Sequence, residues 1–326
     1  MRRREFIMRI GGAAAAWPFV ALAQQSSKVW RIAHVYPGKL DNPPDRAMYD
    51  VFRGELRELG YVEGKNLIID QRSAEGRIER IPAMVSELIA LRPDVIVAIT
   101  TPAIAAAQKA TSTIPIIMAP GIDPIGSGFI KSLSRPGGNI TGMVSMSGDA
   151  LGKAIELLHT LLPSALHIAV LLSNNPTHPQ QYELAEVAIK SLGLVAVRVV
   201  APTPDDLEQA FETMRNENCD ALFVIGDVTR PMIVTLAARS RIPAVYQTGL
   251  FVPLGGLASY SPKLSEIYRK AAQYVDRMFK GADPAELPVE QPVVFELALN
   301  LKTAAALGLT IPASVLARAD TVIERD

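Results

Sequence analysis

Two short stretches of the sequence place polar side chains directly after an apolar segment, where they could hold a ligand. Thr100 and Thr101 follow the apolar run 94–99, and Asp227 follows the apolar run 221–225. We expect each run to be a buried strand and the residues beyond it to begin a helix. Hydroxyl groups beside the free amides of a helix N-terminus favour a carboxylate, whereas an aspartate favours a cationic or hydrogen-donating group. The alternative for all three residues is simple capping of the helices.

The two stretches also form a weak internal repeat. Asp94 begins the first run and is followed 21 residues later by Pro115, whereas Asp220 begins the second and is followed 23 residues later by Pro243. Each half of the chain is therefore predicted to carry the same strand-helix-strand unit, in which Thr101 corresponds to Asp227. Open α/β sheets bind ligands at the carboxyl ends of their strands. Chance similarity between two α/β units is the alternative.

Other predicted strands end in residues that could contribute to the same site. A tyrosine at such an end can flank a ligand, although tyrosines more often belong to the core, and polar loop residues are often only solvated. The complete set of expected ligand-binding residues is Tyr36, Thr100, Thr101, Asp123, Ser173, Asn174, Asp227 and Tyr246.

These residues must be positioned by an alternation of apolar strands and amphipathic helices that runs along the whole chain. The pattern predicts two doubly wound parallel-sheet α/β lobes joined by a multi-strand hinge, with a first crossing near 142–147. We expect 28–143 plus about 255–282 to form lobe 1, and 144–254 plus about 283–326 to form lobe 2. Within lobe 1, a helix is expected near 125–134.

The first residues are predicted to be an export signal. Arginines at positions 2, 3, 4 and 9 precede a small apolar run that ends in Ala21-Leu22-Ala23, a pattern typical of a cleaved leader over residues 1–23. The Arg3-Arg4 pair favours the twin-arginine route, and a general secretory signal is the alternative. The apolar run is too short to span a bilayer. We therefore expect a periplasmic protein.

Composition excludes several classes of function. Lys+Arg and Asp+Glu both number 33, so there is no basic excess of the kind that a nucleic-acid partner requires. The chain has one cysteine, Cys219, and four histidines, of which only His178 falls in a loop expected at the cleft. We expect no disulfide, metal or other cofactor.

Enzymatic function is not favoured by any motif. The sequence contains no Gly-x-Ser-x-Gly, His-Glu-x-x-His or phosphate-binding loop motif. The segment from Gly126 begins like a dinucleotide-binding loop, but Lys131 stands where the third glycine belongs. We expect a protein that is not an enzyme. A hydrolase or lyase on the same fold and a sensor for a membrane signalling protein are the alternatives.

Several motifs together resemble the tryptophan/tyrosine-type solute-binding family of ABC transporters. They are the twin-arginine-like leader, Asp123-Pro124, the turn 135–142, the stretch 288–292, and the C-terminal stretches 300–304 and 306–312. The resemblance covers essentially the whole mature chain. It implies the type I periplasmic binding protein fold, with two lobes, three crossings and a ligand trapped between closing lobes.

The resemblance also implies a function and partners. A monomeric periplasmic receptor would capture a small carboxylate-bearing solute, either an amino acid or an aromatic compound, and deliver it to an ABC permease in the inner membrane. In that arrangement Thr100 and Thr101 would bind the carboxylate and Asp227 the amino group, while Tyr36 and Tyr246 would flank the apolar part.

Overall fold

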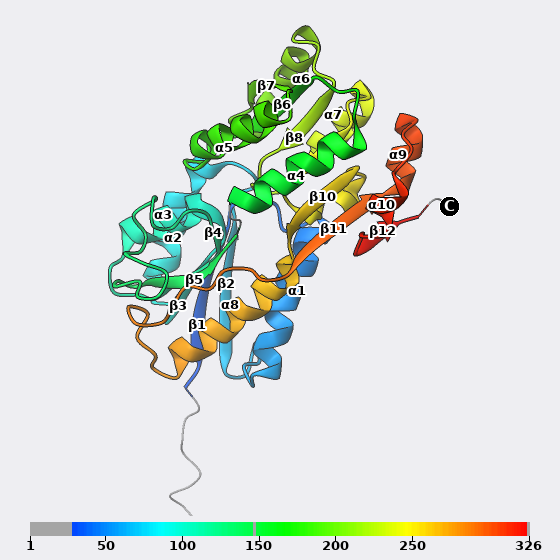
Figure 1. Ribbon diagram of the computed structural model, residues 1–326. Coiled ribbons are helices and arrows are strands. Elements are labelled where there is room, and N and C mark those ends of the chain that lie inside the picture. Colours follow the sequence, from blue (N-terminus) through cyan, green and yellow to red (C-terminus); the bar gives the residue numbers. More distant parts are fainter. Residues whose placement is uncertain (1–27, 146–147, 325–326) are drawn as a thin grey trace, which may run out of the picture.

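The protein consists of two α/β lobes, each built on its own sheet (Figure 1). The computed structural model describes residues 28–145 and 148–324. The expected leader 1–23 and the part of the first crossing at 146–147 lie outside the described residues. The two-lobed α/β class that the sequence predicts is confirmed.

Lobe 1 is built on a five-stranded parallel sheet in the order β2-β1-β3-β4-β5. Its strands are β1 (Trp30–Tyr36), β2 (Leu67–Ser73), β3 (Val95–Ala98), β4 (Ile116–Gly121) and β5 (Ile140–Val144). Helices α1 (Pro43–Glu58) and α8 (Leu264–Phe279) cover one face, and α2 (Ile81–Ala90), which follows the short 3-10 helix η1 (Ile78–Arg80), covers the other with α3 (Thr100–Ala110). Alternate strand residues supply the two cores: Val95 and Val97 pack toward α1 and α8, whereas Ile96 and Ala98 pack toward α2 and α3.

Lobe 2 is built on a seven-stranded sheet in the order β12-β11-β10-β9-β8-β6-β7, in which only the β10–β11 pair is antiparallel. Its strands are β6 (His167–Leu172), β7 (Val195–Val200), β8 (Ala221–Val224), β9 (Ala244–Tyr246), β10 (Ala258–Pro262), β11 (Phe295–Asn300) and β12 (Thr321–Ile323). One face carries α4 (Gly148–Leu161), α5 (His178–Ser191), α9 (Leu301–Leu307) and α10 (Ala313–Leu316). The other face carries α6 (Leu207–Asn216), α7 (Pro231–Ser240), and the 3-10 helix η3 (Gly249–Leu254), and η2 (Pro204–Asp206) leads into α6.

The internal repeat inferred from the sequence corresponds to a repeat in the fold. The order β2-β1-β3-β4-β5 in lobe 1 matches β7-β6-β8-β9-β10 in lobe 2, and the units β3-α3-β4 and β8-α7-β9 are equivalent. In both sheets the strand order reverses at the centre, between β1 and β3 and between β6 and β8. The carboxyl ends of these central strands are where such sheets bind ligands.

The structure corrects the expected lobe boundaries at two places: β10 lies in lobe 2 rather than lobe 1, and residues 283–290 lie on lobe 1 rather than lobe 2. Strand β10 falls in the stretch 255–282 that the sequence predicts for lobe 1, but it pairs with β9 and β11 in the sheet of lobe 2. Helix α8, which follows it directly, packs against α1 and β4 in lobe 1. The chain then stays on lobe 1, where Val289 N–H donates to the Leu133 carbonyl, and returns to lobe 2 at β11. The separation between lobes is therefore set by sheet pairing, which a local apolar pattern does not report.

The helix expected near 125–134 is wrong. Residues 122–134 form turns and bends, in which the Asp123 carboxylate accepts a hydrogen bond from Gly126 N–H at 3.0 Å. Gly128 has a φ of 71°, which interrupts a right-handed helix. Phe129 and Ile130 are nevertheless buried, so their apolar character reflects core packing rather than a helical stripe.

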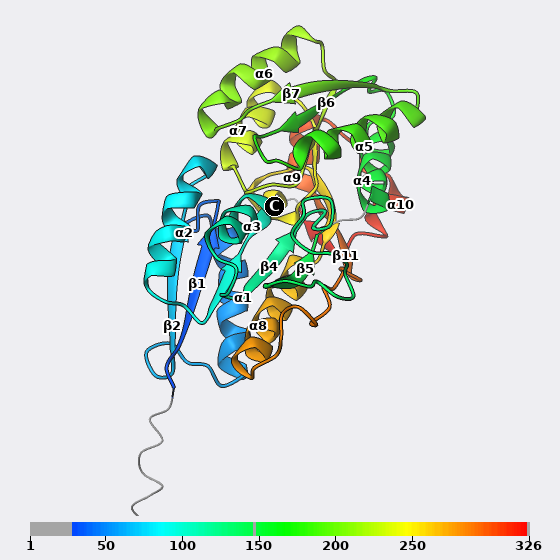
Figure 2. The same ribbon diagram turned by 90° about the vertical axis from the view of Figure 1, so that its left-hand side faces the viewer.

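Figure 2 shows the two lobes one above the other, and side chains of the two lobes are in contact. Arg77 of lobe 1 forms an ion pair with Asp205 of lobe 2 at 2.9 Å, and Gly76 lies against the Pro204 ring. The two lobes therefore contact each other directly at this point. Within the described ranges, none of the helices has both the length and the apolar character needed to cross a membrane.

Candidate functional site

A cavity lies between the lobes at the carboxyl ends of the central strands. Lobe 1 contributes Tyr36 at the end of β1 and Thr100 after β3, and lobe 2 contributes Asp227 after β8. The rest of the lining is largely apolar, including Ile99, Pro120, Ile122, Val228, Leu250, Pro262 and Leu264. The cavity thus lies at the edge where the sequence predicts a ligand site, the carboxyl ends of the central strands.

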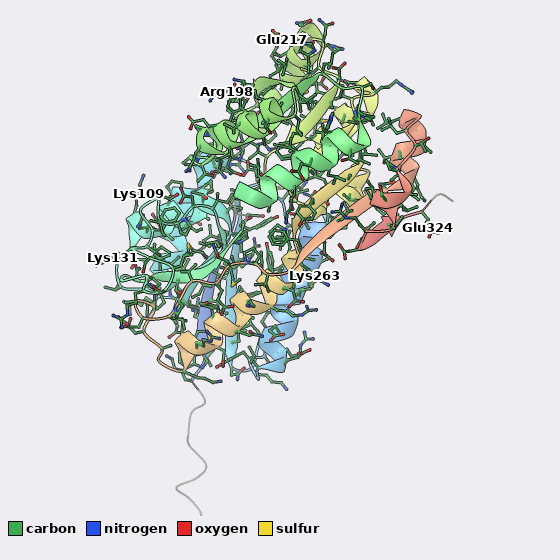
Figure 3. The ribbon with its side chains drawn as sticks, in the orientation of Figure 1. Lys109, Lys131, Arg198, Glu217, Lys263 and Glu324 are labelled. Atoms are coloured by element: carbon green, nitrogen blue, oxygen red, sulfur yellow. The ribbon has the colours of Figure 1, made fainter. Side chains whose placement is uncertain are left out.

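Asp227 is the only charged residue that lines this cavity within the described part of the chain. Lys109, Lys131 and Arg198 instead extend from the outer surfaces of the lobes in Figure 3. The cavity thus provides no side-chain cation for an anionic ligand. Any carboxylate held here has to rely on hydroxyl groups, side-chain amides and backbone amides.

Such donors are present at the start of α3. Ile99 occupies the N-cap position and no side chain caps this helix, so the capping alternative does not apply to Thr100 or Thr101. Both hydroxyl oxygens are buried without a hydrogen-bond partner among the described residues, and Thr100 lines the cavity. An uncapped helix N-terminus beside a free hydroxyl is a site suited to a carboxylate.

The backbone at Thr100 is also strained. Its φ is 64°, in the left-handed region that a β-branched residue rarely adopts. Strain of this kind costs on the order of 1–3 kcal/mol and is found preferentially at binding sites. It turns the threonine at the very start of α3 into the cavity wall.

Asp227 has several partners within its own lobe. Its carboxylate accepts hydrogen bonds from Ser173 Oγ at 2.5 Å and Asn175 Nδ2 at 3.4 Å, and it pairs with Arg230 Nη2 at 3.2 Å. Arg230 also donates to the Ala201 carbonyl at 2.9 Å. The buried negative charge is therefore compensated by a buried guanidinium.

These partners determine the protonation of the cluster. Burial works to raise the pKa of Asp227, but the neighbouring His178 and Arg230 and the hydrogen bond from Ser173 together lower it below its ordinary range. Burial lowers the pKa of His178. Its Nδ1 accepts from Ser173 N–H at 2.7 Å, so Nε2 donates to the Gly226 carbonyl at 3.3 Å and the ring orients the loop that carries Asp227.

The structure does not bring three of the expected residues into the cavity. Asp123 caps its own turn, and Asn174 is exposed while its neighbour Asn175 makes the contact with Asp227. Tyr246 stacks on Phe251 at 4.6 Å within the core of lobe 2. Successive side chains along a strand point to opposite faces of the sheet. A position near the end of a strand therefore does not decide whether the side chain points into the cleft.

Two of the remaining predicted residues lie behind the cavity wall. Ser173 is 8% exposed and holds Asp227, and Thr101 is buried in the first turn of α3 without lining the cavity. Tyr36, Thr100 and Asp227 are the predicted residues that line it.

Sequence reasoning also missed part of the lining. Gln247 follows β9 and accepts a hydrogen bond from Gly226 N–H at 2.5 Å through Oε1, which leaves its amide Nε2 free to donate. Tyr268 enters from α8, and Gln181 enters from α5. The position of Gln247 at a strand end was a usable signal, whereas no local pattern distinguishes a helix residue that reaches the cleft from one that fills a core.

Comparison with known proteins identifies the family. Residues 40–323 match the family described as ABC transporter substrate binding protein. The chain belongs to this family. This substrate-binding protein is 28% identical to the tyrosine-binding protein of Clostridioides difficile over 259 residues, which cover 78% of this chain and 74% of the relative.

Solved structures agree with the assignment. The ABC domain from Streptococcus pneumonia in complex with L-Trp superposes with a TM-score of 0.82 and 28% identity, covering 90% of this chain and 99% of that one. A conserved domain protein of Vibrio cholerae gives a TM-score of 0.83 and 27% identity, covering 90% and 100% of the two chains. A periplasmic binding protein/LacI regulator from Alkaliphilus metalliredigens, at 13% identity and a TM-score of 0.57 over 82% of this chain and 96% of that one, shares the fold alone. The type I fold and the resemblance inferred from the sequence are confirmed.

Proposed function

We propose that this substrate-binding protein captures an amino acid with an aromatic or apolar side chain in the inter-lobe cavity and delivers it to an ABC permease. The observation that carries the proposal is the start of α3, where the helix has no side-chain cap and Thr100, whose hydroxyl has no partner among the described residues, lines a cavity without lysine or arginine. A helix N-terminus in this setting favours a carboxylate. The captured solute would therefore be a carboxylate-bearing one.

The remaining walls support an apolar side chain on the solute. Pro120, Val228, Leu250 and Leu264 offer apolar surface, and the Tyr36 ring adds a flat aromatic face. Ligand pockets typically combine such a lining with few convergent polar groups. The names of two relatives, a tyrosine-binding protein and a domain crystallised with L-Trp, agree with this ligand class.

A binding screen tests the proposal. Purified protein is mixed with L-tryptophan, L-tyrosine, L-phenylalanine, L-leucine and simple aromatic acids, and the unfolding temperature is measured. A ligand that binds only the folded protein raises this temperature by mass action, so a rise of several degrees is expected with aromatic amino acids. Each hit is then incubated and analysed for product. Absence of a shift with every amino acid, or consumption of a hit, contradicts the proposal.

Delivery is a separate step with its own test. Substrate-binding proteins of this family act with a membrane permease, and the protein is proposed to do so as an exported periplasmic monomer. Uptake of the identified solute is compared in cells that carry the gene and cells that lack it. Loss of uptake supports delivery, whereas unchanged uptake with an altered response to the solute favours the sensor alternative.

A further inference from the structure

The two buried carboxylates nearest the cavity differ in how their charge is balanced. Asp227 is paired with Arg230 at 3.2 Å. Asp45, at the start of α1, is 2% exposed and forms no ion pair with any residue of the described ranges. A buried charge without a counter-charge is costly, so an arriving cation would be attracted to Asp45 rather than to Asp227.

Asp45 is connected to the cavity through Tyr36. The Tyr36 hydroxyl donates a hydrogen bond to Oδ1 of Asp45, and Tyr36 itself lines the cavity. Since a tyrosine has a single hydroxyl proton, this bond leaves the oxygen of Tyr36 as an acceptor toward the cavity. A hydrogen-donating group of the solute would therefore be accepted at this point, with the carboxylate behind it.

The other groups around Asp45 are incompletely satisfied. Asn42 of lobe 1 and Thr229 of lobe 2 lie beside the carboxyl group. Asp45 Oδ2, Asn42 Nδ2 and Thr229 Oγ1 are all buried without a well-formed hydrogen bond to any described residue. Three such atoms from both lobes around one carboxylate are rare in a folded interior, and they indicate a place that a further polar group completes.

We propose that Asp45 supplies the negative charge that balances a cationic group of the solute, with the Tyr36 hydroxyl between them. Asp45 is thus a positioning residue that selects solutes carrying an ammonium group. The inference rests on the proposed function, because it assigns the second end of the amino acid whose carboxylate faces α3. It also replaces the expectation that Asp227 binds the amino group.

Titration of Asp45 provides a readout that a purely structural role would not move. Burial raises the pKa of Asp45, opposed by the hydrogen bond from Tyr36 and by the polar groups of Thr229 and Asn42 beside the carboxyl group. The other titratable groups around it keep their charge state between pH 5 and pH 7.5: burial raises the pKa values of Tyr36 and Tyr268, and that of Asp227 is lowered despite its burial. Acidification from pH 7.5 should therefore protonate Asp45 first and weaken binding of a cation.

The experiment compares L-tryptophan with indole-3-propionate, which lacks the ammonium group, and with tryptamine, which lacks the carboxylate. Dissociation constants are measured by calorimetry for the wild type, Asp45→Asn and the control Asp41→Asn, whose side chain is 85% exposed. Asp45→Asn should weaken the binding of L-tryptophan at least about tenfold and leave the dissociation constant of indole-3-propionate nearly unchanged. It should also abolish the loss of affinity on acidification, which the wild type and Asp41→Asn retain.

Tyr36→Phe gives a second route to the same answer if Asp45→Asn does not fold. It should also weaken the binding of L-tryptophan more than the binding of indole-3-propionate. Equal effects of Asp45→Asn on both ligands, or an unchanged pH profile, would overturn the inference and reduce Asp45 to a stabiliser of the α1 N-terminus. Binding of tryptamine without L-tryptophan contradicts the proposed carboxylate site but upholds Asp45. Binding of indole-3-propionate as tightly as L-tryptophan by the wild type overturns the role of Asp45 and leaves the carboxylate site intact, whereas failure of all three ligands overturns both.

Discussion

Replacing Arg230 by methionine tests the balance of charge beneath the cavity. The Arg230 and Asp227 side chains are each only 8% exposed, so the substitution leaves a buried carboxylate without its counter-ion. It also removes the donor to the Ala201 carbonyl. The methionine fills much of the same volume, which keeps a packing defect from dominating the result.

The magnitude follows from these contacts. Breaking a buried ion pair by removing one partner costs about 3–5 kcal/mol. Asp227 keeps the hydrogen bonds from Ser173 and Asn175, which places the expected loss of unfolding free energy near the lower end, at about 3 kcal/mol. The double variant Arg230→Met, Asp227→Asn removes both charges and should recover more than half of that loss.

Urea unfolding of the single and double variants measures these differences. Arg239→Met is the matched control, because its ion pair with Glu208 is exposed on both sides, at 61% and 57%, and should be worth less than about 1 kcal/mol. A loss for Arg230→Met no larger than for this control would refute the reasoning.

The same series predicts how stability depends on pH. In the wild type the folded pKa of Asp227 is lowered, so its contribution is present above the ordinary carboxyl pKa and is lost as the pH falls through the lowered value. Without the guanidinium, burial raises this pKa instead. The deficit of Arg230→Met should therefore shrink as the pH is lowered from 7 toward 4, and a deficit that is constant with pH contradicts the charge argument.

Two further substitutions test individual backbone positions. Thr100→Gly relieves the strain of a φ of 64° and should raise the unfolding free energy by up to about 1 kcal/mol. The same substitution should weaken binding of the amino acid several-fold in calorimetry. A gain in affinity would contradict the role of the Thr100 hydroxyl. Gly142→Ala should lower the unfolding free energy by more than about 2 kcal/mol, because its φ is 126° and an added Cβ would meet the Met118 carbonyl oxygen at 2.4 Å. Gly54→Ala is the control, because Gly54 lies within α1 and nothing lies within 4 Å of the added Cβ, so this substitution should be stabilising. Equal effects of the two glycine substitutions on thermal unfolding would rule out the close approach of β5 to β4.

Local patterns were sufficient for most elements of the two lobes. Continuous apolar runs such as Val95–Ala98 are read correctly as buried strands because both faces of a parallel sheet are covered by helices. The pattern failed in residues 125–134, where buried Phe129 and Ile130 follow a turn instead of a helix. Short elements with little apolar surface, such as β12 and α10, gave no periodic signal.

The same distinction between local sequence pattern and tertiary packing applies to the candidate site. The repeat in the sequence predicts that Thr101 and Asp227 follow equivalent strands, and the structure shows that these strands, β3 and β8, are equivalent and that Thr100 and Asp227 line the cavity beyond them. Which partners each residue meets depends on packing between elements distant in sequence. Only the tertiary structure shows that Arg230 already compensates Asp227, and that Asp45 of α1 lies behind Tyr36 without a cation, because a buried charge is balanced in three dimensions rather than along the chain.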